Sequence, residues 1–212
     1  MADSLLDIGG EDIFPLDPNW ASRPSHSYNF TRYINQYPGT STEIETKNDE
    51  IPWIVEAEFD IQSKEEEFEF LTFIHTAYGR VKRFWLKHPK SLFRIKDPLS
   101  NGSTQINAYT DNSELIAQGY ERIWIELSSG DILTRHVSAI VLDEPNNEVQ
   151  LTLPTAVDRD IALSEVVRIG RILLVRFDND RISLTIHNDY RSSTRLTFHE
   201  LVKEYSELAA NP

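Results

Sequence analysis

Residues 63–78 carry the one clear helix pattern in this chain, and that pattern limits how the rest can fold. Ser63 and Glu66 have the spacing of a capping box, which satisfies backbone N–H groups at the start of a helix. The apolar positions that follow have helical spacing: Phe70, Phe73, Ile74 and Ala77. Since no second strong helix precedes Pro154, we expect this helix to bury its apolar face against a β-sheet.

The segments around the helix have the alternation and the turn residues of short strands. The expected strands are residues 28–33, 42–46, 52–59, 83–86, 92–95, 105–109, 122–127, 136–142, 148–153, 171–177, 182–186 and 194–198. The last three are expected to form an antiparallel meander in which Ile182, Leu184 and Ile186 face inward. A short terminal helix is expected over residues 201–208.

These elements predict a mainly β fold with one packed α-helix, divided into two parts. After Trp85 the pattern changes to many short strands, which is typical of a small closed β-barrel, here expected to be of the OB type. Long apolar strands return later and indicate an antiparallel β core around the helix. The expected boundaries are 1–13 for a flexible N-terminal arm, 14–85 plus 156–202 for the β core with a helix at 64–78, 86–155 for the inserted barrel, and 203–212 for a C-terminal tail.

Three aromatic residues are expected to be structural anchors. Trp20 follows Pro15 and Pro18, which impose an extended path, and is expected to pin the N-terminal segment to a core. Phe73 lies on the apolar face of the helix, and Trp85 lies where the sequence pattern changes from the helix to short strands.

Composition limits the partners and the chemistry of the chain. A net charge of -13 argues against nucleic acid as the main partner, because neutralising phosphates takes clustered lysine and arginine. A hydrophobic fraction of 40% and an aromatic fraction of 10% indicate a folded chain despite that charge. The absence of cysteine excludes disulfides, thiol catalysis and cysteine-based zinc sites.

No sequence pattern for catalysis or cofactor binding stands out. The six histidines include no pair with metal-ligand spacing on one expected face. Asp178-Asn179-Asp180 lacks the glycine and the terminal glutamate of a calcium loop and is interpreted as a hairpin turn. The acidic run from Glu65 to Glu69 is interpreted as a solvated helix start, in preference to paired catalytic carboxylates. We therefore expect no enzyme activity, no cofactor and no metal.

One stretch of this acidic chain is densely basic. It comprises Arg80, Lys82, Arg83, Lys87, His88, Lys90, Arg94 and Lys96. Nucleic-acid binding is one interpretation, since aromatic residues are interleaved with these cations. We favour an interface between copies of the chain, in which the basic stretch meets acidic positions of a neighbour, such as those from Glu43 to Glu67. The residues assigned to this interface are Arg80, Lys82, Arg83, Lys87 and Lys90.

Several short motifs follow one another along the chain in a distinctive order. They are Phe14-Pro15 through Asn19-Trp20; Tyr78-Gly79-Arg80 with Phe84-Trp85-Leu86; Val167-Arg168-Ile169 leading into Leu173 through Phe177; and Asp180-x-Ile182 with the strand Leu196-x-Phe198-x-Glu200. This order resembles small tail proteins of long-tailed bacteriophages over nearly the whole chain, from about residue 14 to 202. It departs at Lys87, where the family pattern has a proline and Pro89 comes two residues late.

Among tail proteins, the layout of strands, one helix and a β insert is similar to distal tail proteins of the tail tip or baseplate. The resemblance implies a structural virion protein whose belt domain forms a ring at the distal end of the tail tube. It implies a homo-hexamer, with a trimer as the alternative, that connects the tube protein to the tail-tip hub. The expected location is the virion tail tip, after synthesis in the host bacterial cytoplasm. No membrane partner is expected, and no nucleic acid beyond DNA passing through the ring.

A second hypothesis is that the chain is a binding module and not a ring protein. The β insert is alternatively a binding module for cell-surface glycan, or another minor tail-tip module, with Trp85, Tyr109, Tyr120 and Trp124 as stacking platforms. The mass in solution separates the two hypotheses. A ring-sized oligomer favours the ring protein, and a glycan-binding monomer favours the module.

Overall fold

The computed structural model describes residues 12–19, 25–28, 32–36, 42–46, 53–88, 93–110 and 122–201. These residues form antiparallel strands and one α-helix, α1 (Lys64–Ala77), which confirms the predicted mainly β class with a single helix. The chain divides into two compact units. The first unit comprises Met1–Ile13, Trp85–Leu173 and Leu208–Pro212, and the second comprises Phe14–Phe84 and Leu174–Glu207.

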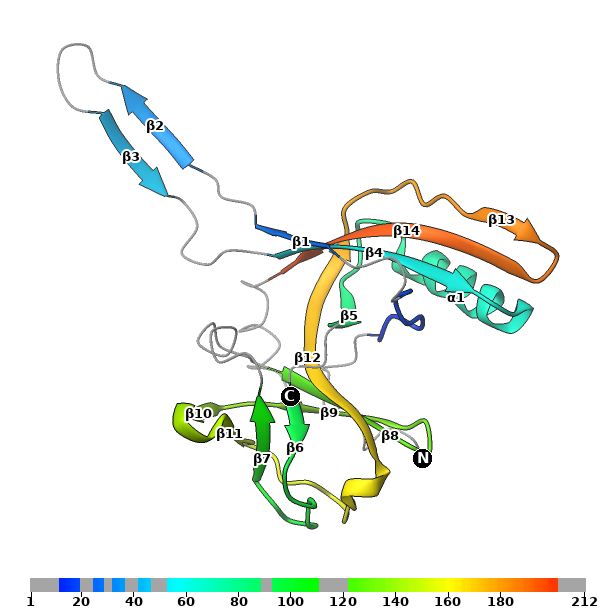
Figure 1. The fold of residues 1–212 in the computed structure, drawn as a ribbon. Helices are drawn as coiled ribbons and strands as arrows, with labels where there is room; N and C mark the ends of the chain where they lie inside the picture. Colours follow the sequence, from blue (N-terminus) through cyan, green and yellow to red (C-terminus); the bar gives the residue numbers. More distant parts are fainter. Residues whose placement is uncertain are drawn as a thin grey trace. The chain divides into compact units, whose positions relative to one another are not determined.

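The second unit is built on a sheet with the strand order β1-β4-β14-β12 (Figure 1). β1 (Ser25–Tyr28) pairs with the start of β4 (Trp53–Ile61), and β4 pairs along its length with β14 (Arg191–Glu200). The end of β12 (Val166–Phe177) pairs with the end of β14, and β13 (Thr185–Asn188) pairs with its start. The buried side chains of β4 alternate, as expected of a strand with one covered face: Val55, Ala57, Phe59 and Ile61.

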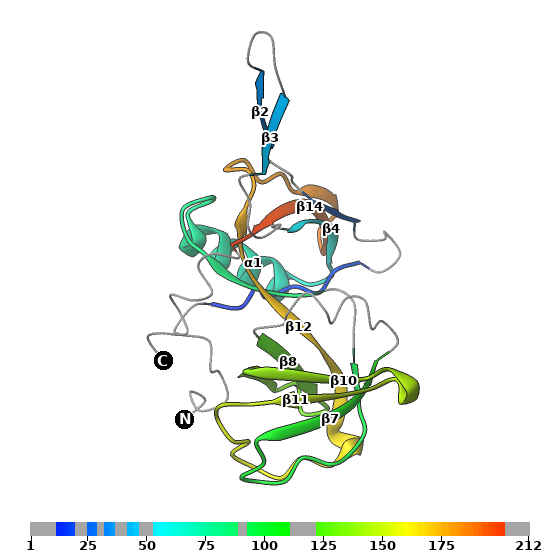
Figure 2. The ribbon, with the colours of Figure 1, turned by 90° about the vertical axis from the view of Figure 1, so that its left-hand side faces the viewer.

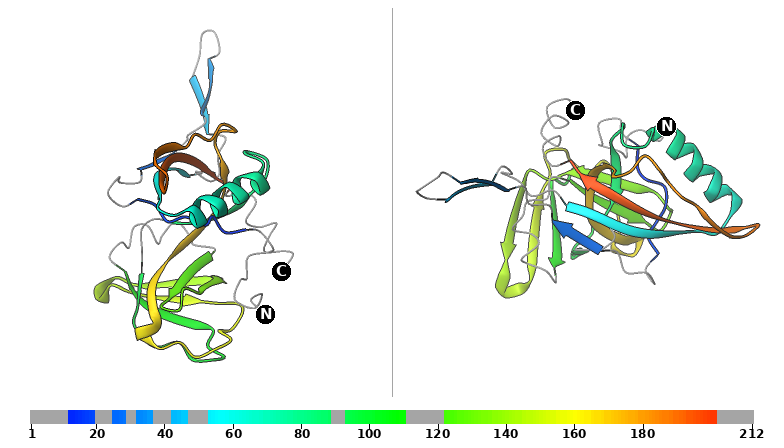
Figure 3. Two further views of the ribbon diagram at one scale, coloured as in Figure 1. Left: turned by 90° about the vertical axis from the view of Figure 1, so that its right-hand side faces the viewer. Right: turned by 90° about the horizontal axis from the view of Figure 1, so that it is seen from above.

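Helix α1 lies against this sheet (Figure 3) and begins as the sequence predicts. Ser63 Oγ accepts a hydrogen bond from the backbone N–H of Glu66 at 3.1 Å. The Glu66 carboxylate in turn accepts from the backbone N–H of Gln62 at 2.7 Å, so the box closes one residue before Ser63. Phe70 and Ala77 are buried and Phe73 is half-buried, which confirms the predicted apolar face.

Helix α1 ends at Ala77, one residue before the expected end at 78, and two left-handed residues follow it. Tyr78, with φ of 49°, takes a left-handed conformation, and Gly79 follows with φ of 61°. The carboxylate of Asp180, in the turn after β12, accepts a hydrogen bond from the backbone N–H of Arg80 at 2.9 Å. A Cβ atom at Gly79 would lie 2.7 Å from the same Asp180 oxygen. The close approach of this turn therefore requires a glycine at position 79.

Phe14 is the centre of an aromatic cluster in the second unit. Its ring centroid lies 5.0 to 6.3 Å from the centroids of Phe59, Phe70, Phe73, Phe84, Phe177 and Phe198. Most of these pairs meet edge to face, a geometry that adds about 0.5–1.5 kcal/mol per pair beyond the burial of area. The N-terminal segment is thus anchored through Phe14. Trp20, to which we assigned that role, lies outside the described residues.

A separate two-stranded sheet stands in the connection between β1 and β4. β2 (Arg32–Gln36) pairs with β3 (Thr42–Thr46) in antiparallel register, with Ile34 opposite Ile44. β3 confirms the strand predicted at 42–46. The strand predicted at 28–33 is wrong, because its two ends belong to β1 and β2, which pair with different strands.

The first unit continues from the start of β12 through β6 (Phe93–Ile95), β7 (Gln105–Thr110), β11 (Glu148–Thr152) and β10 (Ala139–Asp143) (Figure 2). β8 (Arg122–Leu127) also pairs with β12, and β9 (Ile132–His136) pairs with β8. β5 (Phe84–Lys87) carries the chain into this unit, and two short 3-10 helices complete it, η1 (Glu144–Asn146) and η2 (Leu163–Glu165). The core is mostly aliphatic and includes Ile106, Ile123, Ile125, Leu133 and Leu151.

The closed barrel predicted for this part is not confirmed. Within the described ranges no ladder joins β9 to β10, so the sheet is open there. The single strand predicted at 136–142 is divided between β9, which pairs with β8, and β10, which pairs with β11; the backbone N–H of Ser138 already donates to Thr152 O of β11 at 2.8 Å. β9 itself was missed, since Thr134 and Arg135 are both buried and the strand does not alternate.

The last predicted meander is wrong in part. β12 pairs directly with β14, and β13 lies at the edge of the sheet beside the start of β14. Ile182 and Leu184 are half-buried, but Ile186 is 72% exposed because this edge strand has no covered face.

Residues 156–173 lie in the first unit, whereas sequence patterns placed them with the β core. The reason is the long strand β12, whose first half pairs with β8 and, at Ile169, with Phe93 of β6. The chain therefore returns to the second unit only after Leu173.

Candidate interaction surface

The basic stretch is divided between the two units. Arg80, Lys82 and Arg83 lie in the second unit, and Lys87, His88, Arg94 and Lys96 lie in the first. Lys90 is outside the described residues.

The second-unit part follows directly after α1 and is open to solvent. Arg80 and Lys82 are exposed and Arg83 is half-buried. The Lys82 ammonium lies 5.5 Å from the centroid of the Tyr78 ring, which is itself exposed. Arg80 is fixed through its backbone by Asp180, which leaves its guanidinium available to a partner.

Lys87 is buried within the first unit, whereas a residue that contacts another copy must be exposed. Only 9% of it is exposed, and its ammonium lies 5.7 Å from the centroid of the Trp124 ring. The Arg168 guanidinium lies 5.5 Å from the same ring, and that of Arg122 lies 5.3 Å from the ring of Trp85. These cation–π contacts hold cations against buried aromatic rings within the first unit. Lys87 therefore contributes to packing.

Lys96 and Arg94 both border Tyr109. The two cations lie 5.6 and 5.1 Å from the centroid of its ring, and Lys96 Nζ is 2.6 Å from Glu148 Oε1. The hydrogen bond from Lys96 to Glu148 is the main cause that raises the pKa of Lys96 above its usual 10.5. This pair joins the end of β6 to the start of β11.

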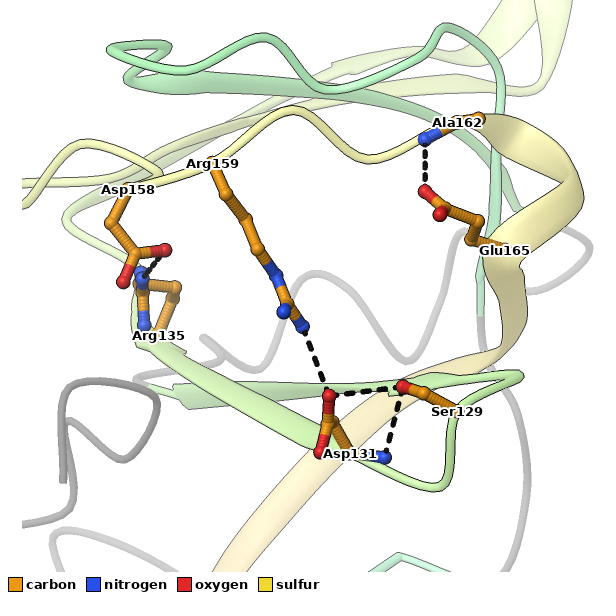
Figure 4. A network of polar contacts seen from close by, with 7 residues as sticks. All are labelled: Ser129, Asp131, Arg135, Asp158, Arg159, Ala162 and Glu165. Atoms are coloured by element: carbon orange, nitrogen blue, oxygen red, sulfur yellow. Dashed lines mark hydrogen bonds and ion pairs between the residues drawn. The ribbon is translucent and has the colours of Figure 1, made fainter. Parts of the chain in front are cut away.

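A polar network that sequence patterns did not indicate secures the segment after β11 (Figure 4). The buried Arg135 side chain lies 3.3 Å from Asp158 Oδ1, and Arg159 Nη2 lies 3.6 Å from Asp131 Oδ2. Ser129 Oγ donates to the same Asp131 oxygen at 2.9 Å. The network ties residues 158–159 to β9 and to the turn before it, which is a structural role.

Two histidine side chains of the described residues have close polar neighbours. Among the described residues no group of three or more histidine, aspartate or glutamate side chains is placed to hold a metal ion. His199 Nε2 lies 2.7 Å from Asp178 Oδ1, and His187 Nε2 lies 2.8 Å from Ser193 Oγ. Within the part of the chain that the structure covers, no helix is long and apolar enough to cross a membrane.

Comparison with known proteins adds no identification. No protein-family model matches the chain, and no curated protein matches it.

Sequence reasoning missed one further surface feature, on the outer side of α1. Phe68, Leu71 and Tyr78 are 73%, 43% and 69% exposed, and Val81 just beyond the helix is 80% exposed. Phe68 and Leu71, three residues apart, are neighbours on the surface of α1, whereas Tyr78 and Val81 follow the end of the helix. We call these four residues the α1 stripe.

Proposed function

We propose that this chain is a structural protein of a bacteriophage tail, of the distal-tail-protein type. In this proposal the second unit is the belt that forms a ring at the distal end of the tail tube, and the first unit is an inserted domain related to OB barrels. The ring connects the tube protein to the hub of the tail tip. It contains six copies, with three as the alternative.

The observation that carries the proposal is that the motifs behind the resemblance meet in one core. Phe14, Phe84, Phe177 and Phe198 come from four different motifs. Their ring centroids lie 4.7 to 6.3 Å from one another. These four phenylalanines are buried and pack against one another in the core of the second unit. Their role here is to build a fold, as expected of a structural virion component.

The interface between copies is proposed for the exposed cations after α1. Arg80 and Lys82 are exposed, and Arg83 is half-buried beside them. In a chain with a net charge of -13, a closed ring needs local pairing of opposite charges to offset repulsion between copies. These cations supply one side of such a contact.

The glycan-binding alternative is not favoured by the surroundings of its proposed platforms. Trp85 and Trp124 are buried, so neither ring presents a face to a sugar. Tyr109 is half-buried between Arg94 and Lys96, and Tyr120 lies outside the described residues.

Gold-labelled antibodies against this chain test the proposed location. On negatively stained virions the label is expected at the junction between the tail tube and the tail tip. Phage that lack the gene are expected to stop tail assembly before the tube is built. Normal tails without this gene, or virions that carry no label, would contradict the proposal.

A further inference from the structure

The α1 stripe lies on and directly after a helix whose apolar face is already buried in the second unit. Phe70 and Ala77 are buried in that unit, while Phe68 and Leu71 of the same helix, and Tyr78 directly after it, are exposed. The stripe therefore has two apolar parts, Phe68 with Leu71 on the helix and Tyr78 with Val81 after its end, and the exposed His75 lies between them in the chain. Patches of this kind mark interaction surfaces more often than isolated exposed residues do.

The two halves of the stripe carry opposite charge. The first turn of α1, which precedes Phe68 and Leu71, is net acidic: it contains Glu65, Glu66 and Glu67 together with Lys64, whose ammonium lies 5.3 Å from the centroid of the Tyr190 ring. Arg80 and Lys82 flank the half that contains Tyr78 and Val81. The 14 residues of α1 separate these ends by roughly 21 Å, at about 1.5 Å per residue. Each half therefore has an apolar centre with a charged rim, the arrangement found in protein interfaces.

We infer that the C-terminal half of the α1 stripe in one copy packs against the N-terminal half in the next copy. This pairing places Tyr78 and Val81 against Phe68 and Leu71 of the partner. It also brings Arg80 and Lys82 near the partner's acidic first helical turn. Contact between two equal halves would instead place like charges together, which is unfavourable.

The contact joins two different surfaces, so each copy can bind one neighbour through each half. Repetition of such a heterologous contact closes into a ring when the rotation between copies allows it. The closure into a ring rests on the proposed function. The pairing of the halves does not require a ring, because two copies can also form it reciprocally as a dimer. It rests only on the exposure and the charges of the α1 region.

Two charge-reversal variants of the full chain test the pairing. One carries Arg80→Glu with Lys82→Glu, and the other carries Glu65→Lys with Glu67→Lys. Each is expected to raise the dissociation constant between copies about tenfold or more, because one rim then meets like charge. An equimolar mixture of the two variants is expected to regain the wild-type assembly, because each reversed rim then finds its complement.

Two controls separate the pairing from general effects. Arg176→Glu with Arg181→Glu changes the net charge as much as the basic-end variant does, at exposed positions of the same unit, and is expected to assemble as the wild type. Leu71→Asp is expected to weaken assembly. Thr72→Asp places the same side chain on a neighbouring exposed line of the helix and is expected to leave assembly unchanged.

Light scattering coupled to size exclusion gives outcomes that separate the two proposals. A ring-sized wild type with both reversal variants dissociated and the mixture restored supports the pairing and the ring. A wild-type dimer with the same response supports the pairing and contradicts the ring. A ring-sized wild type whose variants also assemble overturns the pairing alone, and a monomeric wild type overturns both.

Discussion

At the scale of single residues, Phe14 contributes more to the second unit than its place in an irregular segment suggests. It is fully buried and contacts six other phenylalanine rings. Phe14→Ala is expected to lower the free energy of unfolding by about 3–5 kcal/mol, as for other buried phenylalanines. Phe73→Ala is expected to cost less because Phe73 is half-buried, and Glu67→Ala less than about 1 kcal/mol. Equal losses in denaturant melts at all three positions would contradict the packing described here.

Gly79 and Gly130 both have positive φ angles, but their surroundings differ. A Cβ at Gly79 meets Asp180, whereas a Cβ at Gly130 has no neighbour within 4 Å. Gly130→Ala is expected to cost about 1–2 kcal/mol from backbone strain alone. Gly79→Ala is expected to cost more, because the turn after β12 must also move. Denaturant melts of the two variants measure this difference, and a smaller loss at Gly79 would show that the approach of Asp180 is not as described.

Lys96 offers a test by titration. Its pKa is raised above 10.5, chiefly by the hydrogen bond to Glu148. A raised pKa means that the stabilising contribution is complete below the unfolded value and is lost as the pH rises through the folded value. In NMR titration Glu148→Gln is expected to lower the pKa of Lys96 toward 10.5. An unchanged pKa in that variant would assign the shift to another group.

At the scale of elements, the start of α1 depends on one hydroxyl. Ser63 Oγ accepts from the Glu66 N–H, so Ser63→Ala leaves that donor without its partner. The variant is expected to lose about 1 kcal/mol of stability, while Ser63→Asp, which keeps an acceptor, is expected to lose much less. Thermal melts of the two variants check this order, and equal stability would mean that water replaces the cap at no cost.

The elements that the sequence predicted well are those whose signals are local. The helix has its cap, its acidic first turn and its apolar period within 16 residues, and β4 and β11 alternate cleanly. β9 was missed because Thr134 and Arg135 are buried by contacts from elsewhere in the chain. Ile186 was wrongly expected to face inward. The alternation of residues 182–186 cannot show that β12 pairs directly with β14 and leaves β13 at the edge of the sheet. Which side chains of these strands are buried depends on pairing between distant segments, and the local alternation of residues does not indicate that pairing.

The same limit applies to the candidate surface. Lys87 has the sequence character of an exposed cation, yet it packs beside Trp124, from a strand 37 residues away in the chain. Arg80 and Lys82, which were assigned to an interface with Lys87, are exposed after the end of α1. The spacing of Phe68 and Leu71 shows in the sequence, but only the burial of Phe70 and Ala77 reveals which apolar side chains of α1 remain open.

At the scale of the whole molecule, assembly is expected to depend on charge. The triple reversal of Arg80, Lys82 and Arg83 to Glu is expected to weaken assembly, and to do so most at low salt, where like charges are least screened. Sedimentation velocity over a series of salt concentrations measures this trend. Assembly equal to the wild type at every salt concentration would favour a surface-binding or nucleic-acid role for these cations.

The most direct test of a ring-forming tail protein is the mass of the purified full-length chain. Native mass spectrometry is expected to give a species of about six times the chain mass of 24.5 kDa, or three times for the alternative, with annular particles in electron micrographs of the same sample. A monomer at high micromolar concentration, with no annular particles in the micrographs, would contradict the account.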